Sequence, residues 1–318
     1  MTDPTSSRAE SSRSDHIAFE RDFDPRYGVA VEILPGVRRI TAPNASPITF
    51  HGTNSYIVGT GEVAIIDPGP DDPGHIDALV AATRGERVRH IIVTHTHRDH
   101  SMGVARLKAA TGAETLGEGP HRLSRPGRDG ESGVLDAGGD PDFMPDRRIV
   151  DGEVIVGSGY SLTALATPGH AANHMAFALD GTDHLFSGDH VMGWSTTVVA
   201  PPDGSMADYM ASLDVLAARG ESIYLPGHGA PLRNAPAFVR ALKAHRRLRE
   251  AAIAERIARG DRTIREIVAV IYRETPAALH GAAALSVLAH IEDLVARGRI
   301  RLVSGIGLDG IYEPVNDR

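Results

Sequence analysis

Hydrophobic residues in the first two thirds of the chain occur in short runs, and clusters of Gly, Pro, Asp and Asn separate these runs. The runs are rich in Val, Ile and Leu, a composition typical of buried β-strands that are bounded by turns. We expect strands at residues 30–34, 55–58, 63–66, 90–93, 161–166 and 184–187.

Two stretches between these runs have helical spacing instead. Residues 75–83 carry Ile76, Leu79 and Val80, which lie on one face of a helix. Residues 103–111 follow the fourth predicted strand and have a similar spacing. In both places a strand is therefore followed by a turn and then by a helix.

Residues 117–148 differ from these segments, because Gly, Pro, Asp and Arg crowd them without a sustained period. A loop of this length inside a compact domain is usually functional or disordered. It lies between two segments that hold candidate metal ligands. It therefore either faces a substrate or forms a solvated excursion of the surface.

The chain changes character after residue 229 and becomes rich in Ala and Arg. Helical spacing occurs at 236–257, 263–272 and 283–297, and two short strands are expected at 300–303 and 310–315. Three helices followed by a hairpin form the pattern of a winged-helix domain, and a helical cap on the preceding domain is the alternative. We divide the chain into a disordered leader at 1–24, a main domain at 25–235 and a winged-helix-like domain at 236–318.

The chain has 318 residues, a net charge of −8 and no cysteine. The lack of cysteine excludes disulfides and thiolate metal ligands, and it fits a reducing cytosol, so we expect a cytoplasmic protein. No run approaches the roughly 18 to 20 apolar residues of a membrane helix, so we expect no membrane partner. The leader lacks the apolar core of a secretory signal.

Charge is distributed unevenly along the chain. From Arg240 to the end there are 14 Lys and Arg against 10 Asp and Glu, a net charge of +4, which leaves −12 for the remainder. Two arginine clusters stand out, namely Arg246, Arg247 and Arg249 on the long predicted helix, and Arg297, Arg299 and Arg301 near the predicted hairpin. These clusters either hold a phosphate-bearing partner or form solvated faces.

Three histidines and an aspartate crowd the segment after the strand at 90–93, which reads Thr94-His95-Thr96-His97-Arg98-Asp99-His100. Side chains of an extended segment alternate, so the first two histidines and Asp99 would line one side, and the following turn would bring His100 to them. Imidazole and carboxylate donors suit zinc, and also manganese or iron. The segment predicts a metal site at the carboxyl end of a buried strand.

Three further residues of the metal-ligand type follow predicted strands, each directly after a glycine. They are His170, Asp189 and His228. Glycine lets the backbone turn sharply, so a side chain at a strand end can point into a shared pocket. Together with the first cluster, they supply enough donors for more than one ion.

With these residues in view, the chain resembles the metallo-β-lactamase superfamily over roughly residues 30–230. The matching motifs are Asp67, His95 to His100, His170, Asp189 and Pro226-Gly227-His228-Gly229. Within the superfamily it resembles the lactamase-beta-like protein 2 branch, through Gly188-Asp189-His190-Val191-Met192-Gly193, Thr196-Thr197-Val198-Val199 and Asp208-Tyr209-Met210. The resemblance implies an α/β fold, in which an αββα sandwich precedes the winged-helix-like α+β domain.

The resemblance also implies a metal-dependent hydrolase with a dinuclear centre of two Zn²⁺, with Mn or Fe as alternatives. Seven side chains would hold the ions: His95, His97 and His170 the first, Asp99, His100 and His228 the second, and Asp189 both. A metal-bound hydroxide would act as the nucleophile. Asp99 would orient it and is the predicted catalytic residue.

Five other polar residues are candidates for positioning the ligands or for contacting substrate. They are Asp67, His174, Asn54, Thr196 and Thr197. We expect Asp67 to hold the metal loop by hydrogen bonds, as ligand histidines commonly require. Purely structural roles are the alternative for His174 and for the threonines. His190 is left out, because it points away from the side of Asp189 if that segment is extended.

Three functions are compatible with these observations. The first is an RNA phosphodiesterase of the endoribonuclease kind, which would hold single-stranded RNA through the basic tail. The alternative is a hydrolase of a small thioester, ester or β-lactam, whose tail serves as a cap or as the contact of a homodimer. The third is a nucleic-acid-binding protein with a structural metal, which a two-metal ligand set disfavours.

Overall fold

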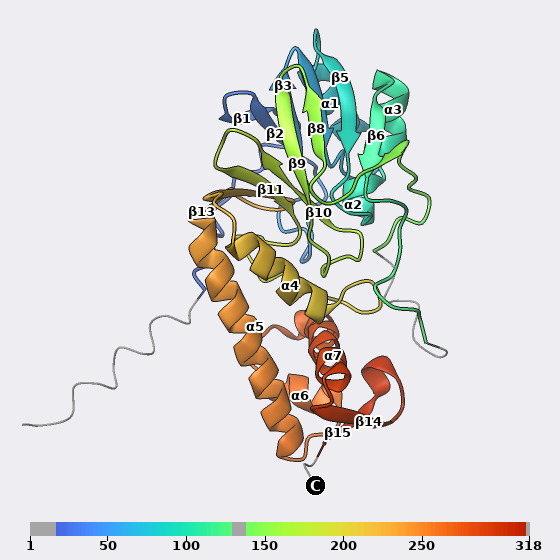
Figure 1. Cartoon of the computed structure of the whole chain (residues 1–318), viewed down its shortest axis with the longest axis vertical. Helices are drawn as coiled ribbons and strands as arrows, with labels where there is room; N and C mark the ends of the chain where they lie inside the picture. The colour runs from blue at the N-terminus through green and yellow to red at the C-terminus, as the bar shows by residue number, and fades with distance from the viewer. Residues whose placement is uncertain (1–16, 129–137, 316–318) are drawn as a thin grey trace, which may run out of the picture.

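The computed structural model describes residues 17–128 and 138–315. Two β-sheets pack face to face in the upper part of Figure 1, and three helices and a hairpin extend below them. Parts of the predicted leader, loop and tail, at 1–16, 129–137 and 316–318, lie outside the described residues.

The first sheet has seven strands in chain order. They are β1 (Val31–Leu34), β2 (Val37–Thr41), β3 (Asn54–Thr60), β4 (Glu62–Ile66), β5 (Arg87–Ile92), β6 (Glu114–Gly117) and β7 (Arg147–Arg148). β1 to β4 pair antiparallel, whereas β4 to β7 pair parallel. The parallel pairing brings the carboxyl ends of β4 and β5 to one edge, where Asp67 and the histidine segment follow.

The second sheet has six strands in the order β13-β12-β11-β10-β9-β8. They are β8 (Val154–Gly157), β9 (Tyr160–Ala166), β10 (Met175–Leu179), β11 (His184–Gly188), β12 (Ile223–Pro226) and β13 (Leu232–Arg233). β11 and β12 are parallel, and the other pairs are antiparallel. The connections after β9, β11 and β12 carry His170, Asp189 and His228.

Alternate residues of the central strands belong to different cores. On β3, Tyr56 and Val58 face the space between the sheets, in one apolar cluster with Phe177 and Phe186 of the second sheet. Ile57 points to the opposite side and joins the cluster under the outer helices. Because both faces are covered, these strands appear in the sequence as continuous apolar runs.

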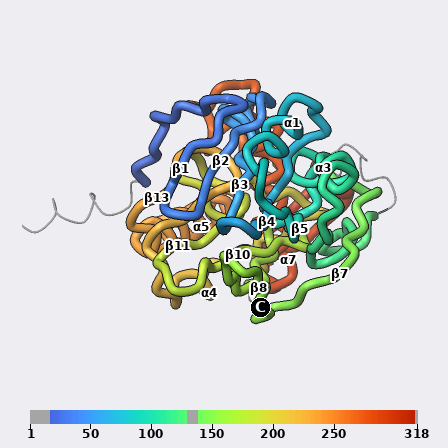
Figure 2. Tube along the Cα trace, turned by 90° about the horizontal axis from the view of Figure 1, so that it is seen from above, coloured from blue at the N-terminus to red at the C-terminus, as the bar shows by residue number. Residues whose placement is uncertain are grey.

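Helices cover the outer faces of both sheets. The first sheet carries α1 (Pro73–Ala82) and α3 (Val104–Thr111), and the second carries α4 (Met206–Ala217) and the first half of α5 (Ala235–Ala258). The short helix α2 (Arg98–Ser101) lies in the connection between β5 and α3. Figure 2 shows α1 and α3 on one side of the layers and α4 on the opposite side. The αββα sandwich that the sequence predicts is therefore confirmed.

The C-terminal elements form the predicted winged-helix arrangement around a separate apolar core. After α5 come α6 (Ile264–Ile271), α7 (His280–Ala296), β14 (Ile300–Ser304) and β15 (Ile311–Pro314). The Thr263 side chain caps α6 in a reciprocal contact with Glu266. By length and composition alone, Ala277–Ala296 would span a membrane, but α7 supplies much of this core.

Helix α5 belongs to two cores at once. Val239 and Leu242 pack with the second sheet, whereas Ile253 and Ile257 pack with α6 and α7. Ala289 of α7 also reaches the core beneath the second sheet. The division at residue 235 falls at the first residue of a helix that both domains share, and the boundary drawn from the sequence stays a prediction.

Residues 17–24 pack against the main domain. Ile17 is 5% exposed and lies in the core beside α5. The Glu20 amide donates to the carbonyl of Gly193 at 2.9 Å, and Arg39 lies 4.3 Å from the ring centroid of Phe23. The prediction of a disordered leader up to residue 24 is therefore wrong for this segment, because its large apolar side chains find partners.

Candidate metal centre

The segment after β5 changes from extended to helical within the histidine cluster. His97 is extended and precedes α2, which begins at Arg98 and places Asp99 and His100 in its first turn. The alternation expected from the sequence therefore stops before Asp99, because the helix replaces a period of two residues with one of 3.6. Both sets of side chains still reach the same space.

The glycines before the other three donors allow a close approach of the backbone. Gly188 has a φ of 49°, a left-handed conformation that glycine adopts at no steric cost. A Cβ atom on Gly227 would lie 2.3 Å from Oδ1 of Asp189. A Cβ atom on Gly188 would lie 2.5 Å from Nε2 of His174, so a larger residue at either position would displace a side chain of the site.

His95, His97 and His170 form a first group. Nδ1 of His97 lies 2.9 Å from Nε2 of His95 and 3.0 Å from Nε2 of His170. One nitrogen of each ring lies within 4.8 Å of the other two. Three ring nitrogens so close together are arranged as the ligands of a single ion.

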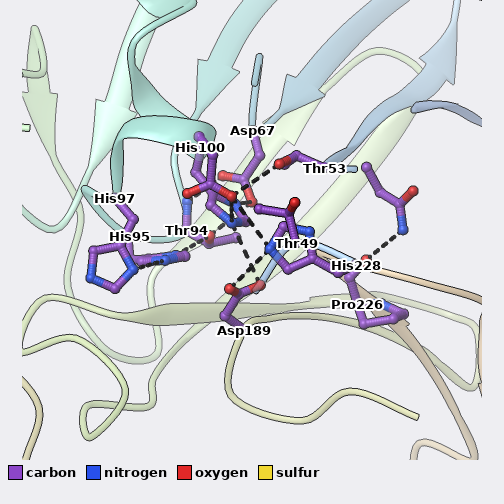
Figure 3. Close-up of polar contacts among 12 residues, drawn as sticks. Thr49, Thr53, Asp67, Thr94, His95, His97, His100, Asp189, Pro226 and His228 are labelled. Atoms are coloured by element: carbon purple, nitrogen blue, oxygen red, sulfur yellow. Dashed lines mark hydrogen bonds and ion pairs between the residues drawn. The ribbon is translucent and has the colours of Figure 1, made fainter. Parts of the chain in front are cut away.

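Asp99, His100 and His228 form a second group beside the first. Oδ2 of Asp99 lies 3.4 Å from Nε2 of His100 and 3.4 Å from Nε2 of His228. Asp189 stands between the groups, because its Oδ2 lies 3.2 Å from Nε2 of His228 and 3.7 Å from Nε2 of His170. Figure 3 shows the side chains of His100, His228 and Asp189 converging from separate segments of the chain.

Three buried atoms of the centre have no hydrogen-bond partner in the described part of the chain. They are Nε2 of His100, Nε2 of His228 and Oδ1 of Asp189. A buried polar atom without a partner costs about 1–3 kcal/mol, and all three atoms face the same space. Metal coordination would satisfy them, so the residues fit divalent cations.

The rings of His228 and His170 differ in electrostatics. At His228 burial opposes the charged form, but Asp189 and Asp99 outweigh it and raise the pKa to about 10. At His170 burial and the nearby His97 ring together lower the pKa to about 4. The contrast concerns these two rings, because burial also opposes the charged form of His97 in the first group, but Asp203 outweighs it and raises the pKa of that ring. His170 is kept in the neutral form that binds metal.

Asp67 orients two ligand rings, His100 by a direct contact and His95 through Thr94. Its carboxylate accepts hydrogen bonds from the amide and hydroxyl of Thr94, both at 2.8 Å, and lies 2.9 Å from Nδ1 of His100. The hydroxyl of Thr94 in turn lies 3.0 Å from Nδ1 of His95. Asp67 has a φ of 52°, a strained conformation of the kind found at functional sites.

The remaining rings have outer contacts that sequence reasoning misses. Nε2 of His97 lies 2.8 Å from Oδ2 of Asp203, Nδ1 of His170 lies 2.7 Å from the Val198 carbonyl, and Nδ1 of His228 lies 3.1 Å from the Gly52 carbonyl. Asp203 follows Pro201-Pro202 and precedes glycine, a composition that signals a turn. That signal gives no information about the histidine that Asp203 contacts.

Asp99 is the most exposed of the seven side chains. It is 27% exposed, whereas the side chains of His100 and His228 are 0% and 1% exposed. The Thr53 hydroxyl donates to its Oδ2 at 3.0 Å. Asp99 therefore combines a fixed orientation with access from solvent, which a proton acceptor at the reacting water needs.

Asn54 braces the loop that carries His228. Its Nδ2 donates to the carbonyls of Pro226 and Gly229, at 3.1 and 2.9 Å. Its Oδ1 accepts from the hydroxyl of Thr41 at 3.0 Å. Asn54 therefore fixes the backbone on both sides of His228 and does not reach the centre itself.

The other predicted residues lie around Asp189. Nε2 of His174 accepts from the Asp189 amide at 3.1 Å, and the Thr197 hydroxyl donates to the Asp189 carbonyl at 2.8 Å. Thr196 is half-buried and is not among the residues that contact the ligands. The His190 ring packs against Tyr209, outside the groups that would hold a metal.

Residues 48–228 match the model of the metallo-beta-lactamase superfamily. The chain belongs to this superfamily. Residues 263–306 match the beta-lactamase associated winged helix domain, and the structure places α6, α7 and β14 there. The protein is thus a metallo-β-lactamase-fold hydrolase with a C-terminal winged-helix domain, and its place in the lactamase-beta-like protein 2 branch stays a prediction.

Several fungal proteins are similar over most of this chain. The lactamase-like protein aptB of Emericella nidulans is 31% identical over 84% of this chain and 83% of its own. Two further similar proteins are named atrochrysone carboxyl ACP thioesterases. The Aspergillus terreus protein is 30% identical over 79% of this chain and 72% of its own length. The Aspergillus chevalieri protein is 31% identical over 77% of this chain and 75% of its own length.

Two solved metallo-β-lactamase structures have the same fold. A beta-lactamase domain protein from Burkholderia ambifaria aligns with a TM-score of 0.75 at 21% identity and covers 92% of this chain and 96% of that one. A metallo-beta-lactamase family protein from Thermus thermophilus aligns with a TM-score of 0.70 at 24% identity, over 89% of this chain and 100% of that one. At these identities the likeness concerns the fold alone.

Proposed function

We propose that the protein hydrolyses acyl thioesters with the help of two divalent cations, zinc in first choice. The observation that carries this proposal is the complete set of seven donors, in a chain 30% and 31% identical to two proteins named as thioesterases. The donor set supports metal-dependent hydrolysis, and the relatives favour a thioester among its substrates. Hydrolysis of a small thioester is the alternative set out from the sequence.

His95, His97 and His170 would hold one cation, and Asp99, His100 and His228 the other, with Asp189 between them. Bound there, the cations would lower the pKa of a water molecule and favour negative charge on the oxygen of the substrate carbonyl. The protein contributes a fixed geometry, because the outer nitrogen of each ligand ring has a hydrogen-bond partner.

Asp99 is the residue that we assign to proton transfer. The contact from Thr53 holds one carboxylate oxygen in place. Burial opposes ionisation of Asp99, but His100 and His228 outweigh it and lower the pKa, so the carboxyl is ionised. The water oxygen adds to the thioester carbonyl carbon, the carbon–sulfur bond breaks, and the proton passes to the leaving thiolate.

The RNA phosphodiesterase that the sequence placed first has no support among the relatives described above. Two of the six arginines offered to a phosphate-bearing partner are also engaged within the protein. Arg246 is 3% exposed and lies 5.1 Å from the ring centroid of Tyr209. Arg297 pairs with Glu250 at 2.6 Å and with Asp293 at 2.9 Å. These two arginines therefore serve the packing of α5 and α7.

The proposal is tested by incubating metal-loaded protein with an acyl thioester, single-stranded RNA and a cephalosporin in parallel. We expect release of free thiol from the thioester, its loss after chelation, and its return when zinc is added. RNA and cephalosporin should remain intact on the same timescale. Cleavage of RNA with an intact thioester would reverse the choice of substrate.

A further inference from the structure

We infer that Glu292, on α7 of the winged-helix domain, is a positioning residue for the metal centre. It holds the segment 120–128, and this segment contacts the loops around His95, His97 and His170. The winged-helix domain would then take part in organising the centre, in addition to covering the second sheet.

Glu292 and the segment meet across the boundary between the two domains. Nε and Nη2 of Arg125 donate to the two carboxylate oxygens of Glu292, at 2.9 and 2.7 Å. Nη1 of Arg128 donates to the same carboxylate at 2.9 Å. The Arg125 and Glu292 side chains are only 18% and 19% exposed. A bidentate pair that is largely shielded from water is more specific in geometry than an exposed one.

One path leads from this pair to the first group of ligands. Beside Arg125, the amide and hydroxyl of Ser124 both donate to the Pro202 carbonyl, at 2.9 and 2.8 Å. The next residue is Asp203, whose Oδ2 lies 2.8 Å from Nε2 of His97. A shift of the segment would therefore move the carboxylate that orients this ring.

A second path reaches the same group from the other side. Nδ1 of His121 lies 2.9 Å from the hydroxyl of Thr96, the residue between His95 and His97. Nη2 of Arg122 donates to the Ala172 carbonyl at 2.7 Å, in the loop that carries His170. The segment thus contacts all three loops that bear on the first group.

The segment depends on these contacts for its position, because residues 120–128 form neither a helix nor a strand. Loss of the Glu292 carboxylate should leave the fold intact and loosen the segment. Removal of a direct outer partner typically weakens metal affinity by about 10–100-fold. Glu292 acts on the outer partners only through the segment 120–128, so we expect a smaller loss of metal affinity, of about 3–10-fold.

The test compares Glu292→Ala and Glu292→Gln with Asp293→Asn as the matched control. Asp293 is the next residue on α7, and its carboxylate pairs with Arg297 inside the C-terminal region. We expect faster hydrogen exchange at residues 120–128 and weaker zinc binding in chelator competition for Glu292→Ala, an intermediate effect for Glu292→Gln, and wild-type values for Asp293→Asn. Unchanged exchange and zinc affinity in Glu292→Ala would overturn the inference, as would equal losses in Asp293→Asn.

Arg125→Gln tests the same contact from the catalytic side, should the Glu292 variants fail to fold. Alone, it should speed exchange at residues 120–128 and weaken zinc binding as Glu292→Ala does, and unchanged values would count against the contact. Where Glu292→Gln folds, the double variant should add no further loss of zinc affinity. A kinetic readout, a fall in kcat for the thioester with KM changed less, rests on the proposed function. Exchange and metal affinity do not, so failure of thioester hydrolysis leaves the inference testable.

Discussion

In the winged-helix core, Val287, Leu288 and Ile291 are fully buried in an apolar cluster. In the metal centre the buried side chains are imidazoles and carboxylates, and three of their atoms lack a hydrogen-bond partner among the residues that the structure describes. The first region lowers the free energy of the fold by removing apolar surface from water. The second holds polar groups together at a cost in stability, as functional sites commonly do.

Because one region stabilises the fold and the other holds polar groups for function, substitutions in the two regions should have different effects. Changes in the apolar core should lower the free energy of unfolding and leave metal binding alone while the protein is folded. Changes in the centre should remove metal or activity and leave stability nearly unchanged. The contact at Glu292 is where we expect the two regions to influence each other.

Asp99→Asn should have the largest effect, because it removes both a proposed ligand and the proton acceptor. Loss of general acid–base catalysis typically lowers rates by about 10²–10⁴-fold, and we expect a fall in kcat/KM for the thioester in that range. Release of free thiol measures it. Asp71→Asn, at an exposed carboxylate that pairs with Arg106 at 2.9 Å, is the control, and equal activity of both variants would contradict the role of Asp99.

Leu288→Ala should destabilise the protein without affecting the centre. Truncation of a fully buried leucine costs about 2–5 kcal/mol, measured as the free energy of unfolding in denaturant. Leu302→Ala on β14, where the residue is 40% exposed, should cost much less. If the folded Leu288→Ala protein lost its bound metal at low temperature, the claim that the two regions act independently would be contradicted.

Asp203→Asn should weaken metal binding with little change in stability. Its carboxylate contacts Nε2 of His97 at 2.8 Å, and loss of such an outer partner costs about 10–100-fold in metal affinity. Competition with a chromogenic chelator measures the affinity. An unchanged affinity would show that His97 does not need this contact to be oriented.

His290→Gln tests how the buried imidazole of α7 contributes to the pH dependence of stability. Burial, reinforced by Arg246 and Arg249, lowers the pKa of His290 to about 3 from an ordinary value of 6.5. Below about pH 6.5 the unfolded chain therefore binds a proton at His290, whereas the folded chain does not. The free energy of unfolding consequently falls as the pH falls. Between pH 7 and 5 the variant should lose about 2 kcal/mol less than wild type. Parallel pH profiles of denaturant unfolding would refute this assignment.

Much of the sandwich could be predicted from the sequence, because doubly buried strands such as β4 and β5 form unbroken apolar runs. The seven donors could be predicted for a different reason, since each follows a strand end or glycine in a recognisable motif. Helix α4 was not predicted, and neither was β10, although its residues Met175–Leu179 are all buried. Turn residues do mark one end of each element, at Pro201 to Gly204 before α4 and at Asp180-Gly181 after β10, but a short apolar run does not by itself distinguish a strand from a helix.

The outer contacts of the centre could not be predicted. Asp203 is 106 positions from His97 in the chain, and Arg125 is 167 positions from Glu292. Local patterns carry no information about such pairs, because tertiary packing alone brings them together. For the same reason, the arginine-rich tail suggested a phosphate partner, whereas Arg246 and Arg297 find their partners inside the fold.

The metal content of the purified, dialysed protein tests the central claim most directly. Elemental analysis should find about two divalent cations per chain, because seven donors in two groups with a shared carboxylate suit a pair of ions. His228→Ala should retain about one. A wild-type protein that binds one ion or none when zinc is supplied in excess would contradict the dinuclear centre and the hydrolysis proposed to depend on it.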